Sequence, residues 1–245
     1  MNYQKTQNLI EWFNIIFRER ICSDINVIYI ESLKPQWQIL FPNNSLKISC
    51  DLILDLYELG EKKELGCSRK DFSEFDNLYF KDLILPGLIN PPKYLFSRNE
   101  NHLHFEYDFL GLIYMCLSRL EEYNLNSDLK DKHNRFLAKH SHAFINNYLD
   151  RPLIDEWIYY LKFLVKKFCP RIDLISSKFK IYLSHDVDLP SKYHFLKKRE
   201  IFYNLTSQLI KYRRFQEVKN ILRIYSSREK LLTVDPYNKF DWIMD

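Results

Sequence analysis

The first forty residues show two different periods of apolar positions. Residues 6–20 repeat apolar side chains at helical spacing, which predicts a helix with one buried face. The positions that form this stripe are Leu9, Ile10, Phe13, Ile16 and Phe17. Residues 27–30 and 37–41 are short runs of β-branched and aromatic residues bounded by proline-containing stretches, and they predict two strands.

The next sixty residues carry a weaker pattern. The apolar residues of 50–59 are spaced as in a helix, and we expect a second helix there. Residues 60–100 contain Gly66 together with a Pro-Gly and a Pro-Pro pair, which are typical of turns. We therefore expect loops over this stretch, with one strand at 78–80.

Two strongly amphipathic helices are predicted in the middle of the chain. The first follows Asp108, whose side chain can cap it, and runs to about residue 123. The second begins near 151–152, where a proline suits the first turn, and is stopped by 169–170. Asp155 lies in its first turn and lysines lie near its end, an arrangement that the helix dipole favours.

The C-terminal part begins with a strand-like run. Residues 179–183 are mostly apolar and aromatic and lead into the acidic run 184–188, so they predict a strand that ends at polar residues. Two basic amphipathic helical stretches follow, over about 196–212 and 214–226, and another helix is expected to begin at Lys239.

Composition and length place the chain among ordinary globular proteins. Hydrophobic residues make up 46% and charged residues 28% of its 245 residues, enough for one large domain or two smaller ones. The five cysteines are scattered, which argues against a disulfide framework. We find no signal peptide and no apolar run of roughly 18 residues, so we expect a soluble, cytoplasmic protein without a transmembrane segment.

The charge is unevenly distributed. The net charge of +4 is too small to indicate a nucleic-acid-binding protein. Residues 191–230, however, hold eleven lysine and arginine residues against three glutamates. We interpret this stretch as a solvated helical insert. A second interpretation is a weak contact surface for an anionic glycan or lipid.

The acidic run is the clearest chemical feature of the sequence. Side chains alternate along a strand, so Asp186 and Asp188 point to the same side if the chain stays extended, whereas His185 points to the other. Two carboxylates on one side, at the end of a strand, suit a divalent cation and a general base. Acidic residues also end strands simply because the chain enters solvent.

The run 184–188 resembles the first motif of the polysaccharide deacetylase (NodB-homology) superfamily, in its His-Asp-Val-Asp form. Other segments resemble a bacterial subgroup of that superfamily with an uncharacterised N-terminal domain. These segments are 108–123, 131–136, 151–157 and 235–243. The resemblance runs from about residue 105 to the end of the chain.

The resemblance implies a metal-dependent hydrolase with a distorted β/α barrel that removes acetyl groups from an amino-sugar polysaccharide. Asp186 would be the general base and Asp188 a ligand of a zinc-like ion, together with two histidines of a later His-x-x-x-His motif. In the family, such an ion lowers the pKa of bound water to about 7. The fold class expected is α/β: an α+β N-terminal module over 1–175, then the first strand and helical insert of an incomplete deacetylase-type barrel over 176–245.

The chain departs from the family pattern at the metal site. None of its seven histidines lies four positions from another, so the His-x-x-x-His motif is absent. Carboxylates without imidazole hold such an ion weakly in water. We therefore expect this chain to stop early in the catalytic domain, to bind no metal tightly and to be inactive alone. The alternative is a self-sufficient, non-catalytic carbohydrate-binding or protein-interaction module with a vestigial motif.

The remaining polar candidates have simpler interpretations. We expect Arg119 and Glu122 to pair on a helix surface, and their match to the subgroup also suggests a role at the domain junction. Asp131, His133 and Arg135 predict a capped turn, with a carbohydrate-facing role as the alternative.

Two histidine pairs, 102 with 104 and 140 with 142, could each place two imidazoles on one side of the chain. Because no carboxylate cluster adjoins the first pair in the sequence, we expect both pairs to be solvated.

Overall fold

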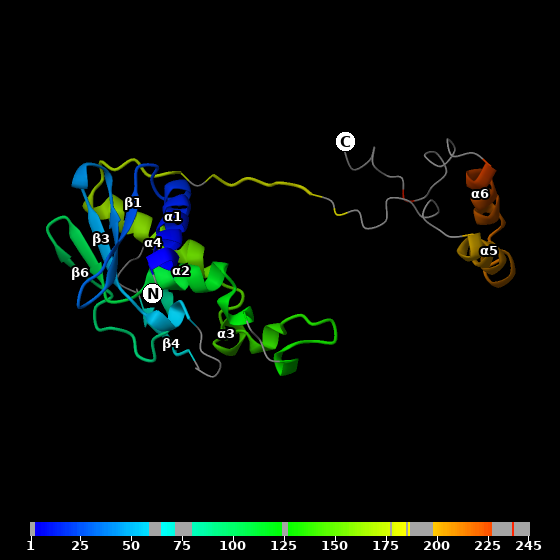
Figure 1. Ribbon diagram of the computed structural model, residues 1–245. Helices are drawn as coiled ribbons and strands as arrows, with labels where there is room; N and C mark the ends of the chain where they lie inside the picture. Colours follow the sequence, from blue (N-terminus) through cyan, green and yellow to red (C-terminus); the bar gives the residue numbers. More distant parts are fainter. Residues whose placement is uncertain are drawn as a thin grey trace. The chain divides into compact units, whose positions relative to one another are not determined.

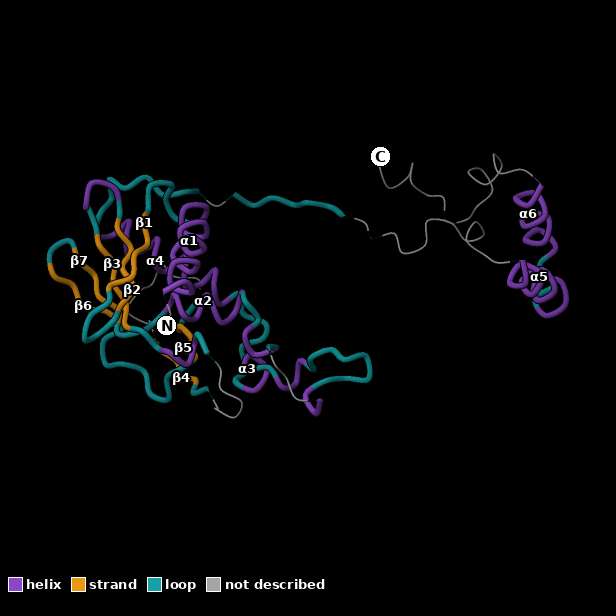
Figure 2. The backbone as a smooth tube through the Cα atoms, in the orientation of Figure 1, coloured by secondary structure: helices purple, strands orange, loops and turns teal. Residues whose placement is uncertain are grey.

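A computed structural model describes residues 3–58, 65–71, 80–123, 127–176, 178–184, 186, 198–226 and 237. The chain divides into two compact units, unit 1 (Met1–Lys178) and unit 2 (Phe179–Asp245). Helices and mixed sheets occur together, which confirms the expected α+β character. Figures 1 and 2 show the elements of each unit.

Unit 1 is built around a mixed five-stranded sheet in the order β1-β2-β3-β7-β6. Its strands are β1 (Asn26–Ile30), β2 (Gln36–Leu40), β3 (Lys47–Asp51), β6 (Phe96–Asn99) and β7 (His102–Phe105). Only the β3–β7 pair of this sheet is parallel, and it joins segments about fifty residues apart in sequence. The strands β4 (Cys67–Asp71) and β5 (Asp82–Pro86) form a second, antiparallel pair.

The longer helices of unit 1 lie on one side of the five-stranded sheet (Figure 1). They are α1 (Tyr3–Arg20), α2 (Phe109–Leu117) and α4 (Leu153–Phe168), with the single turn α3 (His142–Ile145) further along the chain from α2. Short 3-10 turns are η1 (Pro42–Asn44), η2 (Leu54–Leu56), η3 (Leu120–Glu122), η4 (Ser127–Leu129) and η5 (Ala138–His140). We call the opposite side of the sheet the outer face.

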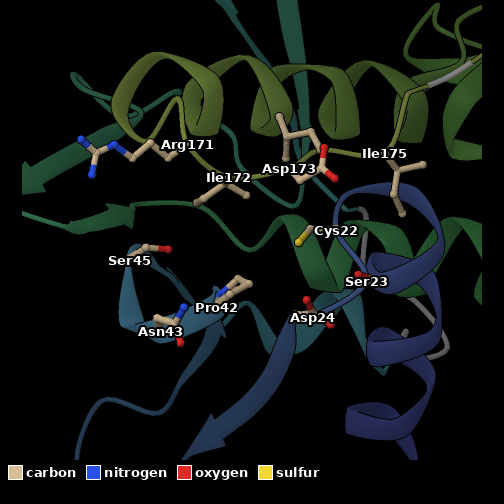
Figure 3. A pocket seen from close by; sticks show the side chains of 11 residues that line it. Cys22, Ser23, Asp24, Pro42, Asn43, Ser45, Arg171, Ile172, Asp173 and Ile175 are labelled. Carbon is tan, nitrogen blue, oxygen red and sulfur yellow. The ribbon is translucent and has the colours of Figure 1, made fainter.

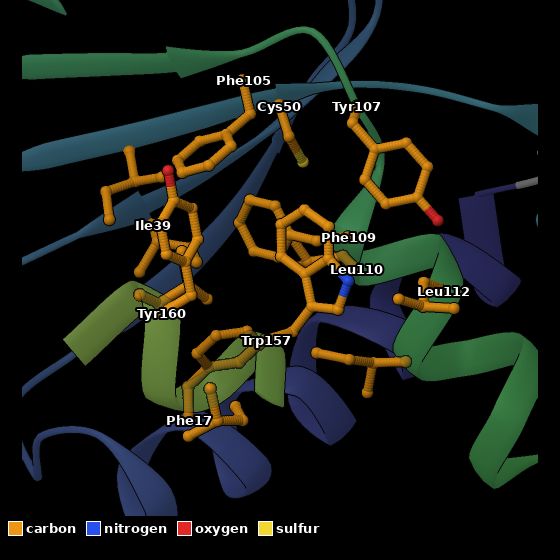
Figure 4. Close-up of a cluster of buried hydrophobic side chains, with 14 of the residues drawn as sticks. Phe17, Ile39, Cys50, Phe105, Tyr107, Phe109, Leu110, Leu112, Trp157 and Tyr160 are labelled. Atoms are coloured by element: carbon orange, nitrogen blue, oxygen red, sulfur yellow. The ribbon is translucent and has the colours of Figure 1, made fainter. Parts of the chain in front are cut away.

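The core of unit 1 is strongly aromatic. Trp157 of α4 is fully buried, with its ring stacked at 5.2 Å from Tyr107 and 5.8 Å from Phe109. The ring of Phe105 of β7 is tilted against the same indole, with the ring centroids 6.3 Å apart (Figure 4). The indole N–H donates to the carbonyl of Ile84 at 3.3 Å, so the polar atom of this large side chain is also satisfied.

The structure confirms the first helix and the first two strands, but the helix expected over 50–59 is wrong. Residues 47–51 form β3, and only the turn η2 follows. Pairing with β2 on one side and β7 on the other outweighs the helical spacing of a short apolar run. The strand expected at 78–80 is not found at Phe80, which lies in a bend before β5, and Leu78 and Tyr79 lie outside the described residues.

The two central helices are confirmed, with one change of length. Asp108 caps α2 by accepting a hydrogen bond from the Gly111 amide at 2.7 Å. The helix ends at Leu117 instead of near residue 123, because Arg119 adopts a left-handed conformation with φ of 51° and only the turn η3 continues the chain. The helix α4 ends at Phe168, followed by Cys169 as expected.

The strand predicted over 179–183 does not form. Residues 178–184 have no secondary structure, and Phe179, Ile181, Tyr182 and Leu183 are 90%, 69%, 83% and 85% exposed. A strand needs a partner for its backbone, and none of the strand pairs formed by the described residues includes these residues. An expected barrel strand is therefore an exposed, unpaired segment here.

The described part of unit 2 is otherwise helical, as predicted. It contains α5 (Lys198–Thr206), the π-helical turn η6 (Ser207–Lys211) and α6 (Phe215–Ser226). The helix expected from Lys239 lies outside the described residues. Across the described residues of both units, none of the helices combines the length and apolarity needed to cross a bilayer.

Candidate functional site

The acidic motif is only partly described by the structure. Asp186 is exposed and follows the unpaired segment 178–184, whereas His185 and Asp188 lie outside the described residues. The expectation that Asp186 and Asp188 share one side of a strand stays a prediction. Among the described residues, no group of three or more His, Cys, Asp and Glu side chains is placed to hold a metal ion.

Arg119 and Glu122 form an ion pair at the end of α2. The guanidinium donates two hydrogen bonds to the carboxylate, Nε to Oε1 at 2.7 Å and one terminal nitrogen to Oε2 at 2.6 Å. The pair closes the turn that Arg119 opens with its left-handed backbone. It lies on the turn η3 and not on a continuous helix, which is the difference from the expectation.

Asp131, His133 and Arg135 form the capped turn that the sequence predicts. Asp131 accepts hydrogen bonds from the backbone amides of His133 at 2.8 Å and Arg135 at 2.9 Å, and from the Arg135 guanidinium at 3.0 Å. The bond from the Arg135 amide leads in lowering the pKa of the Asp131 carboxyl. These contacts shape the loop itself.

Asp155 pairs with Arg20, and this ion pair joins the first turn of α4 to the end of α1. Both side chains are about half exposed. Exposed pairs of this kind contribute about 0–1 kcal/mol to stability, so Asp155 has a modest structural role.

The sequence predicts Asp108 only as a helix cap and does not reveal its contacts with the segment after β3. Besides capping α2, its fully buried carboxyl accepts hydrogen bonds from the Ile53 amide at 2.9 Å and from the Tyr57 hydroxyl at 3.1 Å. Burial raises the pKa of Asp108 to about 7, although these hydrogen bonds act in the opposite direction. The carboxyl thus ties the segment after β3 to the start of α2.

A second network that the sequence does not reveal lies on the outer face of the sheet. The β3–β7 register places Ser49 opposite His104. Ser49 Oγ lies 2.8 Å from His102 Nε2 and 2.8 Å from His104 Nδ1, and His104 Nε2 lies 3.3 Å from an Asp51 oxygen. The sequence shows no carboxylate cluster next to this histidine pair, but the neighbouring strand β3 supplies one carboxylate, that of Asp51.

Arg151 makes the most enclosed ion pairs among the described residues. Its guanidinium donates to Asp82 of β5 at 2.5 Å and to Glu156 of α4 at 2.7 Å. Glu156 is almost fully buried, and Arg151 also donates to the Asp82 carbonyl at 2.7 Å. These contacts fix the small sheet to the first turn of α4.

A hollow of about 410 Å³ lies in unit 1 where residues 171–175 pass the turns after α1 and β2. Figure 3 shows Asp24, Asn43, Arg171 and Asp173 among the side chains that line it, together with the buried Cys22. Amide, carboxylate and guanidinium groups of this kind can hydrogen-bond hydroxyl groups, and the volume falls within the usual range of small-molecule sites.

Unit 1 is thus an α+β domain with its longer helices on one side of the five-stranded sheet. Comparison with known families identifies the family to which it belongs. Residues 3–170 match DUF7033, a family of unknown function, and the chain belongs to that family. The match covers nearly all of unit 1 and none of unit 2. No curated protein and no solved structure matches the chain.

Proposed function

We propose that this protein is a polysaccharide deacetylase-like hydrolase in which the DUF7033 domain precedes a catalytic domain whose first strand is residues 179–183. Asp186 acts as the general base. It takes a proton from the water that attacks the amide carbonyl carbon, the C–N bond breaks, and acetate and a free amino sugar are released.

The observation that carries the proposal is the exposed segment 178–184. Four large apolar side chains of this segment lie in solvent, and an acidic residue of the resembling motif follows. Burying a Phe, Ile or Leu side chain contributes roughly 1.5–3 kcal/mol, so such a segment gains stability from a sheet that accepts it. A catalytic barrel would provide that sheet and would bring Asp186 to its edge.

The donors of the acidic motif do not fit a tightly held zinc-like ion. They are carboxylates, and the His-x-x-x-His motif of the resembling family is missing from the 245 residues. The proposal therefore requires imidazole ligands from outside this sequence, and the 245-residue chain is expected to release no acetate from N-acetylglucosamine oligomers.

The test begins with the DNA that follows the codon of Asp245. A continuation that encodes His-x-x-x-His, in frame or after a frameshift, supports the proposal, and a stop codon without such a remnant contradicts it. The extended chain should release acetate from N-acetylglucosamine oligomers, and Asp186→Asn should abolish the release. Asp150→Asn, at an exposed carboxylate of unit 1 away from the hollow, is the matched control and should leave the rate unchanged.

A second candidate is a non-catalytic carbohydrate-binding module, and the hollow beside Asn43 and Arg171 favours it. Calorimetric titration of the 245-residue chain with soluble amino-sugar oligomers tests this function. Saturable binding that Arg171→Ala weakens, with no acetate released by the extended chain, would favour the module. Arg213→Ala in unit 2 serves as the control.

We also propose a weak contact between unit 2 and anionic surfaces. The helices α5 and α6 and the turn η6 expose Phe202, Tyr203, Ile210 and Phe215 beside several arginines and lysines. Helices with apolar and basic side chains bind anionic membranes. Binding to vesicles with anionic lipid that fades as salt rises supports this contact, and no binding at low salt contradicts it.

A further inference from the structure

The outer-face network contains two imidazoles that converge on one oxygen. His102 and His104 alternate with Leu103 along β7, so both lie on the outer face while Leu103 points into the core. The nearest nitrogens of the two rings, Nε2 of His102 and Nδ1 of His104, each lie 2.8 Å from Ser49 Oγ. We call these two residues the imidazole pair.

The hydrogen bonds fix the proton positions when both rings are neutral. The Asp51 carboxylate can only accept, so His104 carries its proton on Nε2 and presents an unprotonated Nδ1 to Ser49. The Ser49 hydroxyl donates to that nitrogen. Ser49 Oγ then accepts from Nε2–H of His102, which completes a chain running from His102 to Asp51.

This arrangement has the parts of a metal site and not those of a nucleophile. Ser49 is fully buried beneath the two rings, so a substrate carbonyl cannot reach its oxygen. A carboxylate that accepts the second N–H of a histidine, as Asp51 does for His104, is the usual outer partner of a metal-bound imidazole. The unprotonated Nδ1 of His104 is in the form that a metal requires.

We propose that His102 Nε2 and His104 Nδ1 bind a divalent transition-metal ion of the kind that prefers imidazole, with Ser49 Oγ and water completing the coordination. On metal binding, the His102 proton moves from Nε2 to Nδ1, so this ring releases no net proton. This site lies entirely within unit 1 and does not depend on the proposed deacetylase function.

Some groups around the imidazole pair favour the binding of a metal ion, and one opposes it. Burial, together with Lys47 and the neighbouring His104, lowers the pKa of His102, so this ring stays neutral to lower pH. Lys47 lies opposite His102 in the β3–β7 register and repels a cation. The remaining neighbours on this face are uncharged, namely Gln36, Gln38 and Leu40 of β2 and Ser97 and Asn99 of β6.

The second histidine pair provides a comparison within the same chain. His142 has the same sequence spacing from His140, but its Nε2 lies 3.0 Å from the Leu65 carbonyl and its Nδ1 lies 2.5 Å from the Tyr148 hydroxyl. Both ring nitrogens are therefore occupied inside the fold. We expect no metal binding at 140–142, which makes His140→Gln the matched control.

The experiment is a calorimetric titration of the 245-residue chain with Cu²⁺, Ni²⁺, Zn²⁺ and Mg²⁺, each alone, at pH 7.5. We expect saturable 1:1 binding of the three transition metals, tightest for Cu²⁺, and none of Mg²⁺. His102→Gln and His104→Gln should each weaken binding at least about tenfold, and His140→Gln should leave it unchanged. Asp51→Asn should weaken it about tenfold or more, and Lys47→Gln should strengthen it.

The Asp51 side chain is 56% exposed, so Asp51→Asn should fold normally. If a histidine variant fails to fold, Asp51→Asn still tests the proposed metal site. Circular dichroism checks folding in each case. Absence of saturable transition-metal binding would overturn the proposal, as would binding that the imidazole-pair and Asp51 variants leave unchanged. Asp186→Asn should not affect this binding, so the result is independent of acetate release.

Discussion

Units 1 and 2 both contain many aromatic and aliphatic residues, but they use them differently. In unit 1 such side chains from α1, α2, α4 and five strands form one buried cluster. In the described part of unit 2, Ile201 and Ile221 are buried while Phe202, Tyr203 and Phe215 are largely exposed. The comparison shows that composition alone does not decide whether apolar side chains are buried, as in unit 1, or largely exposed, as in the described part of unit 2.

The two units also differ in how they treat polar groups. Unit 1 buries Asp108 and Glu156 and satisfies each with hydrogen bonds from other segments. Such contacts require a unique packing, because an unpaired buried polar group is costly. In unit 2, Asp186 and Arg199 are exposed. Unit 1 thus has the features of a domain that folds by itself.

The largest expected effect concerns the aromatic core. Trp157→Ala should lower the free energy of unfolding by about 3–5 kcal/mol, because it removes a fully buried ring stacked on two others. Phe202→Ala, at a residue 71% exposed, should change it by less than about 0.5 kcal/mol. Urea unfolding followed by circular dichroism measures both, and equal losses would remove the distinction between the units.

The next effect concerns the enclosed ion pairs. Arg151→Ala should destabilise unit 1 by about 3 kcal/mol, because it leaves the nearly buried Glu156 without its partner. Arg151→Met/Glu156→Gln, which removes both charges together, should recover part of that loss. Thermal unfolding of the variants checks the order, and a double variant as unstable as Arg151→Ala would contradict a charge-pair role.

The buried carboxyl predicts a pH dependence with a definite sign. The pKa of Asp108 rises from 3.8 to about 7 on folding, so the folded state holds an extra proton between these values. The contribution of Asp108 to stability is therefore present below about pH 4 and is lost as pH rises through 7.

The side chain of Asp108→Asn cannot titrate. Any loss of stability from placing its amide group beside the Ile53 N–H is therefore the same at every pH. The stability difference between wild type and this variant should shrink from pH 4 to pH 7, by at most about 1.4 kcal/mol per pH unit. A difference that stays constant, or grows, across this range would contradict the assignment.

The smallest effect is expected at the surface pair of η3. Arg119→Ala should cost about 0.2–1 kcal/mol, because both partners are at least partly exposed. The loss should shrink at high salt. A loss above 2 kcal/mol in thermal unfolding would instead indicate a structural role of Arg119 at a domain junction.

Much of the fold follows from local pattern, and much of the chemistry does not. The sequence predicts the buried faces of α1 and α4 and the cap at Asp108 correctly, because residues that are close in sequence form each of them. The apolar spacing of 50–59 predicts a helix, but residues 50 and 51 belong to β3, and its pairing with β2 and β7 is a tertiary contact that the local pattern does not contain. With β3 misassigned, nothing in the sequence could place Ser49 and Asp51 beside the imidazole pair.

The contacts of Asp108 with Ile53 and Tyr57 were hidden for the same reason, since they join segments about fifty residues apart. The error at 179–183 is of another kind. The residues have the composition of a strand, but a strand exists only when a neighbour pairs with its backbone.

Hydrogen–deuterium exchange of the 245-residue chain, followed by mass spectrometry of its peptides, tests this account most directly. Amides of residues 178–184 should exchange completely at the earliest time point, while those of β3 and α4 stay protected for at least minutes. Protection of 178–184 comparable to that of β3 would mean that these residues are already paired in a sheet. That result would contradict the account in which they are unpaired in the 245-residue chain and pair only in a complete catalytic domain.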